Sequence, residues 1–299
     1  MTVPAQALVQ GGIDARPAPR RFLGLLGLAP FGLFALLFLF LPVSFLVVGS
    51  FQSGAGALTL QNYSDLSQQF IIDAYSNSIE ISAVTAIAGG IAGLLLAYAV
   101  VSGRLPRWLQ GVVLTFCGVA SNFAGVPLAL AFIFTIGHNG IVTNWLSQLF
   151  GFDLYGGSFS LYTKIGLEVV YFYFQLPLMV LIMAPAIEGL KPDWREAAEN
   201  LGATTSQYWR TVALPVLTPT ILGTMILLFA NSFGAQATAY QLTACQVNLT
   251  TCVISAELRG NVLHNVGLGY ALAMGMVVIM AIALLFYVLL QRRAERWLR

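Results

Sequence analysis

The amino-acid sequence predicts an all-α membrane protein that crosses the bilayer six times. Of its 299 residues, 58% are hydrophobic and only 9% are charged, whereas a soluble domain carries roughly a quarter charged residues. The apolar residues fall into six long runs separated by polar connections. Because a helix needs about 20 apolar residues to cross about 30 Å of hydrocarbon, each run predicts one spanning helix.

The six expected spans follow one another along the chain, at residues 22–48, 77–102, 108–136, 164–187, 216–240 and 265–291. Together they form a transmembrane domain at 22–291, with a cytoplasmic tail at 1–21 and a basic tail at 292–299. The first run carries no charge, and it is longer than the apolar region of a cleaved signal peptide, which has about 7–15 residues. We therefore expect this run to remain in the membrane as the first span.

The basic residues predict the orientation, because Lys and Arg gather on the cytoplasmic side of short membrane loops. If both termini are cytoplasmic, only Lys164 and Arg259 lie on the outer side. The other twelve of the 14 basic residues then lie inside: Arg16, Arg20, Arg21, Arg104, Arg107, Lys191, Arg195, Arg210, Arg292, Arg293, Arg296 and Arg299. This asymmetry predicts cytoplasmic termini, a cytoplasmic loop at 188–215, and outer segments at 52–76, 137–163 and 241–263.

The cytoplasmic loop at 188–215 is polar and charged, and it carries the signals of a short helix. Asp193 and Glu196 have the spacing of a capping box, in which each residue satisfies a backbone N–H at the start of a helix. Gly202 is a typical residue at which a helix ends. We therefore expect a helix at 194–201.

A second short helix is expected immediately afterwards. Thr204 and Gln207 repeat the capping pattern, and Pro215 is expected to end this helix at the membrane boundary. Ala197 and Ala198 of the first helix are small, so that helix is suited to close approach to a groove on a partner. The loop therefore has the pattern of a helix, a glycine turn and a second helix.

This loop resembles the signature of the membrane subunits of binding-protein-dependent ABC importers. The residues that carry the resemblance are Glu196, Ala197, Ala198, Gly202, Val212, Leu214 and Pro215, and Val212 replaces the family's usual isoleucine. The resemblance implies the type I importer fold, in which the loop is a coupling helix that sits in a cleft of the ATP-hydrolysing subunit. It also implies alternating access, with the pathway turned outward when ATP closes the nucleotide-binding subunits.

The same resemblance implies the partners of the chain. These are a dimer of ABC ATPase subunits, a second permease subunit that is a homologous different chain, an extracytoplasmic solute-binding protein and the lipid of a bacterial inner membrane. The sequence has no G-x-x-x-x-G-K-[ST] phosphate loop. We therefore expect ATP and Mg to bind to the partner ATPase, and this chain to be no enzyme and to hold no cofactor, metal or nucleic acid.

A finer resemblance concerns the substrate. Residues 231–242, and Asn77 with Ser78 at the start of the second span, are similar to permeases for spermidine and putrescine, iron and aminoethylphosphonate. Gln236 departs from the aromatic residue expected in the polyamine group. The resemblance implies a small polar or charged solute such as a polyamine.

Polar residues inside the spans are candidates for the substrate pathway, because a polar group in hydrocarbon usually faces a cavity or a partner helix. These candidates are Glu80, Asn122, Glu168, Tyr171, Gln175, Asn231 and Ser232. Acidic groups with Tyr171 and Tyr173 nearby would suit a cation. Structural roles remain open, because Lys164 lies one turn from Glu168 and these two residues are expected to be able to pair.

Two other classes of protein remain as alternatives. An ion-coupled secondary transporter would use Glu80 or Glu168 as a proton relay. A membrane-embedded hydrolase has little support, because His138 and His264 accompany no nucleophile motif. Cys245 and Cys252 share one outer segment and are a possible disulfide in an oxidising compartment.

Overall fold

The computed structural model describes residues 21–53, 56–103, 105–157, 159–259 and 265–295, and it describes no side chains at 21–27 or 293–295. Most of the predicted tail at 1–21 and the end of the tail at 292–299 lie outside these ranges, as do Arg104 and His264. The described residues are almost entirely helical, with one isolated bridge between Gln52 and Leu58 as their only strand-like feature.

The chain divides into two units, at residues 1–48 and 49–299. The first unit contains helix α1 (Arg21–Ala35), a π-helical turn (Leu36–Phe40) and most of α2 (Leu41–Ser50). Its described side chains are largely apolar, and none between residues 28 and 48 is buried. An apolar helix with no buried face is suited to lipid or to another membrane protein, which agrees with a first span at 22–48.

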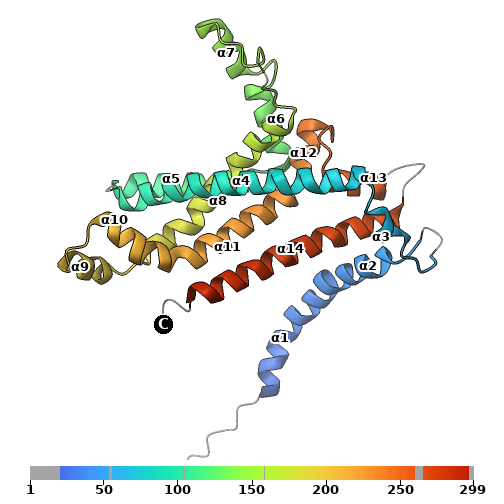
Figure 1. The fold of residues 1–299 in the computed structure, drawn as a ribbon, viewed down its shortest axis with the longest axis horizontal. Helices are drawn as coiled ribbons and strands as arrows, with labels where there is room; N and C mark the ends of the chain where they lie inside the picture. The colour runs from blue at the N-terminus through green and yellow to red at the C-terminus, as the bar shows by residue number, and fades with distance from the viewer. Residues whose placement is uncertain (1–20, 54–55, 104, 158, 260–264, 296–299) are drawn as a thin grey trace, which may run out of the picture. The chain divides into compact units, whose positions relative to one another are not determined.

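The second unit is built around the long helix α4 (Gln69–Ser102). Helix α8 (Lys164–Glu188) packs along α4, and α11 (Leu214–Phe233) contacts both of them. Helix α5 (Arg107–Asn122) lies against α8, and α14 (Val266–Glu295) packs against α11 (Figure 1). These five helices form the bundle that positions the candidate sites.

Small residues on α4 allow its close packing. A Cβ atom added at Gly93 would lie 2.5 Å from the Cβ of Met179 and 2.6 Å from the carbonyl oxygen of Leu176. One turn earlier, a Cβ at Gly89 would lie 2.8 Å from the Cβ of Gln175. Small residues four positions apart let helix backbones approach closely in a membrane, where packing replaces the hydrophobic driving force.

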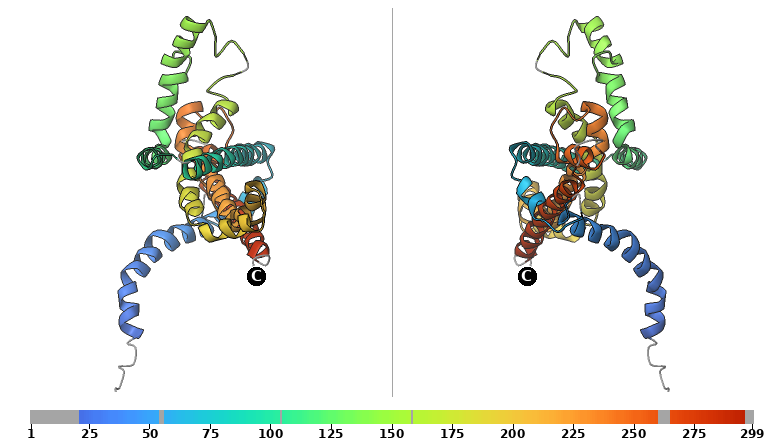
Figure 2. Two further views of the ribbon diagram at one scale, coloured as in Figure 1. Left: turned by 90° about the vertical axis from the view of Figure 1, so that its left-hand side faces the viewer. Right: turned by 90° about the vertical axis from the view of Figure 1, so that its right-hand side faces the viewer.

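Shorter helices surround one end of this bundle. They are α3 (Gln61–Asp65), α6 (Gly125–Ile136), α7 (Ile141–Phe150), α12 (Gln236–Thr243) and α13 (Thr250–Arg259). Both views of Figure 2 show α6 and α7, in green, extending away from the bundle. At this end Asn77 Nδ2 donates to the carbonyl of Asn248, and the backbone N–H of Thr250 donates to Ser78 Oγ.

Six described segments are long and apolar enough to cross a membrane, as predicted: Leu28–Ser50, Gln69–Ser102, Gly125–Phe150, Lys164–Glu188, Thr205–Phe233 and Val266–Arg292. The prediction of a single third helix at 108–136 is wrong. Helix α5 ends at Asn122, the backbone of Ala124 is extended, and a new helix begins at Gly125, whose φ is +71°. Only glycine adopts that conformation readily, and Ser121, Asn122 and Pro127 flank the break within an otherwise apolar run.

Helix boundaries also differ from the prediction at two other places. The second helix begins at Gln69 rather than at 77, and the fifth ends at Phe233, with α12 following as a separate helix. The outer segments predicted as loops at 52–76, 137–163 and 241–263 therefore contain helices. Hydropathy marks the apolar part of a helix, whereas a helix with polar residues continues beyond the hydrocarbon wherever its backbone hydrogen bonds remain satisfied.

Candidate functional site

The predicted coupling loop contains helix α9 (Pro192–Asn200). This helix confirms the predicted one to within two residues, but its capping differs. Lys191 is the N-cap, and no side chain caps the helix there, because Asp193 already lies inside the first turn. The predicted capping box of Asp193 and Glu196 is therefore wrong; Asp193 instead places its negative charge near the positive end of the helix dipole.

The turn after α9 behaves as predicted. Gly202 has φ +78°, and the N–H of Ala203 donates to the carbonyl of Ala198. Thr204 Oγ1 accepts from the backbone N–H of Gln207 at 3.3 Å, while Gln207 Oε1 accepts from the N–H of Thr204 at 2.7 Å. This reciprocal pair is the predicted capping box, and it fixes the direction of the next helix.

The second helix of the loop does not stop at Pro215. Helix α10 (Thr205–Tyr208) passes through a π-helical turn (Trp209–Ala213) directly into α11. Pro215 lies in the first turn of α11, where the extra residue of the π-helical turn accommodates a residue without an N–H. The predicted end at Pro215 is wrong, and the loop is continuous with the fifth spanning helix.

One face of α9 is apolar although no residue of α9 is buried. Trp194, Ala197, Ala198 and Leu201 follow helical spacing, and we call this set the α9 apolar face. Leu201 is 88% exposed and Trp194 38% exposed. By helical spacing Glu196 lies on the opposite side of the helix from this face. Its side chain is exposed, as is that of Leu214 at the start of α11. An exposed apolar face on an otherwise charged helix indicates a surface for a partner protein.

Two contacts that the sequence did not predict tie the loop to the bundle. The ring of Trp209 packs edge-on against Tyr98 near the end of α4, with ring centroids 4.7 Å apart. Gln110 Nε2 of α5 donates to Glu188 Oε1 at 2.9 Å. The ion pair between Arg195 and Glu199 is exposed and adds little stability. The only sequence signal for these contacts was an aromatic pair, Tyr208 and Trp209, in a polar loop.

The structure brings two of the predicted pathway residues together inside the bundle. Gln175 Nε2 donates to Thr85 Oγ1 at 2.7 Å, and Thr85 Oγ1 lies 3.2 Å from Ser232 Oγ. All three side chains are buried, and Gln175 Oε1 has no partner among the described residues. Ser78, Ser82 and Thr85 place hydroxyls at helical spacing on α4. That spacing was the signal for Thr85, which the sequence analysis did not single out.

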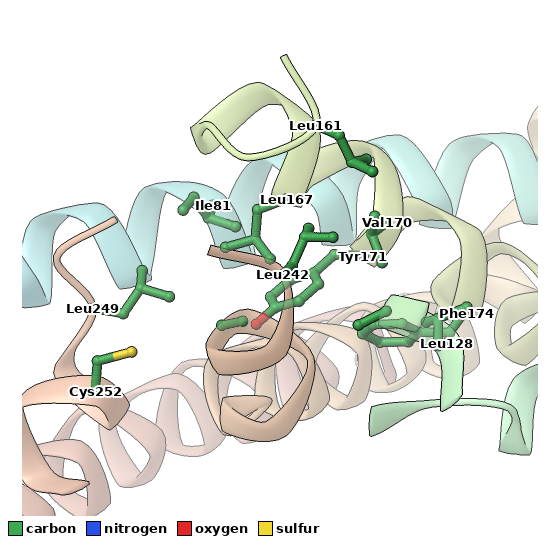
Figure 3. Packing of buried hydrophobic residues seen from close by; sticks show 12 residues of the cluster. Ile81, Leu128, Leu161, Leu167, Val170, Tyr171, Phe174, Leu242, Leu249 and Cys252 are labelled. Carbon is green, nitrogen blue, oxygen red and sulfur yellow. The ribbon is translucent and has the colours of Figure 1, made fainter. Parts of the chain in front are cut away.

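Other predicted pathway residues lie apart from this network. Figure 3 shows Tyr171 in an apolar cluster beside Leu167 and Leu242. Its hydroxyl donates to the carbonyl of Ala235, so neither its ring nor its hydroxyl faces an open route. Asn122 is exposed and bonds within its own helix, to the carbonyl of Gly118 at 2.9 Å; Asn231 is exposed on α11.

The acidic candidates are not equivalent. Lys164, the first residue of α8, forms an ion pair with Glu80 of α4. The sequence left a pairing of Lys164 with Glu168 open, and the structure pairs Lys164 with Glu80 instead. A lysine placed four residues before a glutamate is the less favourable order within a helix. Glu168 is half-buried on the same helix. The charge of Glu80 is balanced by a neighbour within the chain.

The segment predicted to lie outside, at 241–263, contains a disulfide between Cys245 and Cys252, whose Cα atoms are 5.8 Å apart. It joins the segment after α12 to the first turn of α13. Ala244 and Cys245 both have positive φ, so the bond holds the chain in a tight reversal. Cys117 is free and buried within α5.

These features define a multi-pass membrane protein whose polar inter-span loop forms two short helices and leaves an apolar face exposed. Residues 89–296 match the family of binding-protein-dependent transport system inner membrane components. The chain belongs to this family, and it is therefore an ABC importer permease subunit of the inner membrane.

Known relatives and solved structures agree with this assignment. The chain is 31% identical over 202 residues to the sulfate transport system permease protein CysT of Escherichia coli (strain K12), covering 68% of both. It is 29% identical over 271 residues to the spermidine/putrescine permease PotB of Haemophilus influenzae (strain ATCC 51907 / DSM 11121 / KW20 / Rd), covering 86% of this chain and 89% of PotB. A bacterial alginate ABC transporter shares the fold, with a TM-score of 0.72, 21% identity, and 92% and 96% of the two chains covered.

The relatives are transport permeases and not enzymes. The substrates in their names differ, and include sulfate, spermidine with putrescine, and trehalose. The family assignment gives no support to the ion-coupled secondary transporter considered from the sequence.

Proposed function

We propose that this chain forms half of the translocation pathway of an ATP-driven importer, and that α9 couples the pathway to a separate ATPase subunit. The observation that carries the proposal is the α9 apolar face, which is exposed on a helix that a glycine turn and a capping box connect to α11. An exposed apolar face on a short helix is suited to binding in a groove on a partner protein. Glu196, Ala197, Ala198, Gly202, Leu214 and Pro215 are the residues proposed for coupling.

The coupling is mechanical. A displacement of α9 reaches α11 through a continuous helix, and it reaches α4 through the edge contact between Trp209 and Tyr98. Because packed helices move as rigid bodies, a shift at the loop becomes a shift of the spans. ATP and Mg bind to the partner ATPase, since this sequence has no phosphate loop.

The orientation proposed from the basic residues places both termini and α9 in the cytoplasm. The contacts of α4 support it, since Tyr98 meets the α9 side of the molecule and Asn77 meets the segment before α13 at the other end. In this orientation α5, rather than the apolar segment Gly125–Phe150, is the proposed third crossing. Its 16 residues extend about 24 Å at 1.5 Å per residue, and it lies against α8.

The proposed complex contains two ATPase subunits, a second permease that is a homologous different chain, and an extracytoplasmic solute-binding protein. Exposed apolar side chains on α14, such as Ile282 and Phe286, are suited to lipid or to the second permease. The proposed substrate is a small charged solute. A polyamine is the candidate from the sequence resemblance, and relatives named for spermidine with putrescine and for sulfate are both similar to this chain.

Reconstitution of the complex tests this function. The proteoliposomes contain this permease, its companion permease, the ATPase and the solute-binding protein. They should take up solute only when ATP and Mg are present on the side of the membrane that carries the ATPase. A non-hydrolysable ATP analogue is the matched control and should give no uptake. Uptake by this chain alone, driven by a proton gradient, would overturn the proposal in favour of the secondary transporter.

A further inference from the structure

A cavity of about 530 Å³ lies at the α12–α13 end of the molecule. Helices α12 and α13 form two of its sides, and Val126 of α6 borders a third. The cavity is lined on α12 by Gln236, Ala237 and Tyr240, and on α13 by Ser255, Ala256 and Arg259. Cys245 and Cys252 also border it. None of the polar side chains in this lining belongs to the polar network of Gln175, Thr85 and Ser232.

The lining follows helical spacing on both walls. Gln236 and Tyr240 are four residues apart on α12, and Cys252, Ser255 and Arg259 fall at intervals of three and four residues on α13. The disulfide between Cys245 and Cys252 fixes the two walls at one end of the cavity. An amide, a phenol, a hydroxyl and a guanidinium therefore border one space whose walls are covalently joined.

The charge of this cavity is positive. Among the residues that the structure describes, the ion pairs involve Lys164 with Glu80 and Arg195 with Glu199, and neither includes Arg259. Glu257, on the same helix, instead accepts a hydrogen bond from the backbone N–H of Asn265 at 2.8 Å. Of the two basic residues expected on the outer side, Lys164 is thus neutralised and Arg259 has no carboxylate partner in the described part of the chain.

We propose that this cavity binds a small oxyanionic solute, such as one with a sulfate, phosphate or carboxylate group, and that Arg259 selects its charge. The proposal rests on the proposed importer function, and it replaces the polyamine candidate with a small anionic solute. A guanidinium binds the oxygens of such a group through two parallel hydrogen bonds. Gln236, Tyr240 and Ser255 supply further donors for the remaining oxygens. A polyamine would meet only like charge from Arg259.

The test replaces Arg259 in the complete importer and measures uptake into proteoliposomes. The probes are sulfate, phosphate and succinate as oxyanions, spermidine as a cation and trehalose as a neutral solute. Arg259→Gln should lower oxyanion uptake about tenfold or more, as expected for one lost charge-assisted hydrogen bond. Arg259→Lys keeps the charge but loses the paired geometry, and it should give intermediate uptake. Arg292→Gln is the control for the loss of one positive charge elsewhere, and it should match the wild type.

The outcomes separate this inference from the proposed function. Oxyanion uptake that falls in Arg259→Gln while basal ATP hydrolysis is unchanged supports the site. ATP-driven uptake of only spermidine or trehalose, or oxyanion uptake equal in Arg259→Gln and the wild type, overturns the site but leaves the importer function intact. Equal loss of uptake in Arg259→Gln for every solute would assign Arg259 to docking of the solute-binding protein instead. No ATP-dependent uptake of any probe by the wild type would overturn both.

Discussion

Replacing Gly202 with valine is expected to abolish ATP-driven uptake while the permease still inserts into the membrane. Gly202 has φ +78°, a conformation that costs an L-residue about 1–2 kcal/mol and is especially unfavourable for a β-branched one. A Cβ there would meet nothing within 4 Å, so the effect comes from the backbone and not from a clash. The turn would rearrange and move the α9 apolar face away from its expected position relative to α11.

The measurement compares uptake and ATP hydrolysis in reconstituted complexes. Gly202→Asn is the matched control, because asparagine tolerates the left-handed region better than other side-chain-bearing residues. We expect Gly202→Asn to retain most uptake and Gly202→Val to lose at least about nine-tenths of it, the effect of about 1.4 kcal/mol. Normal uptake with Gly202→Val, with the protein present at wild-type level, would contradict the coupling role of this turn.

The substitution Gly93→Leu is expected to have the largest effect on folding. A Cβ at position 93 would lie 2.5 Å from the Cβ of Met179 and 2.6 Å from the backbone oxygen of Leu176, so α4 and α8 would have to separate. Overpacking costs about 1–3 kcal/mol, and the upper end applies here because a backbone atom cannot rotate away. We expect a sharply reduced yield of folded permease.

Thermal unfolding of the detergent-purified permease measures this effect. Gly111→Leu on α5 is the matched control, because a Cβ at position 111 meets nothing within 4 Å. The control should unfold near the wild-type temperature, whereas Gly93→Leu should unfold well below it or fail to accumulate. Equal unfolding temperatures for the two variants would contradict the close contact of α4 with α8.

The sequence predicted the number of spanning segments because hydrophobic length is a local property. It also predicted α9, the glycine turn and the capping box of Thr204 with Gln207, since each depends on residues within one or two turns. The break at Gly125 was missed because the run at 108–136 was read as one span by its length and hydropathy, although Ser121, Asn122 and Pro127 lie close to the break. Pro215 was assigned to a helix end because the π-helical turn before it has no sequence signature.

The contacts between distant residues were the least predictable. Lys164 and Glu168 are one helical turn apart, a spacing at which side chains can pair. Lys164 instead pairs with Glu80, which is distant in the chain. Thr85 was overlooked because its role depends on Gln175 and Ser232 of two other helices, which the spacing of hydroxyls on α4 does not show by itself. The cavity at Arg259 likewise requires the disulfide and two helices, of which hydropathy assigned most of α12 to the fifth span and α13 to a loop.

The proposal that α9 docks on an ATPase subunit is tested most directly by site-specific photo-crosslinking in the assembled importer. A photoreactive residue at Ala197, in the α9 apolar face, is compared with one at Ser147, an exposed position on α7. We expect the probe at Ala197 to crosslink to the ATPase subunit, and the probe at Ser147 to give no such product. A complex that imports solute with ATP but crosslinks to the ATPase only from Ser147, or from neither position, would contradict the coupling role of α9.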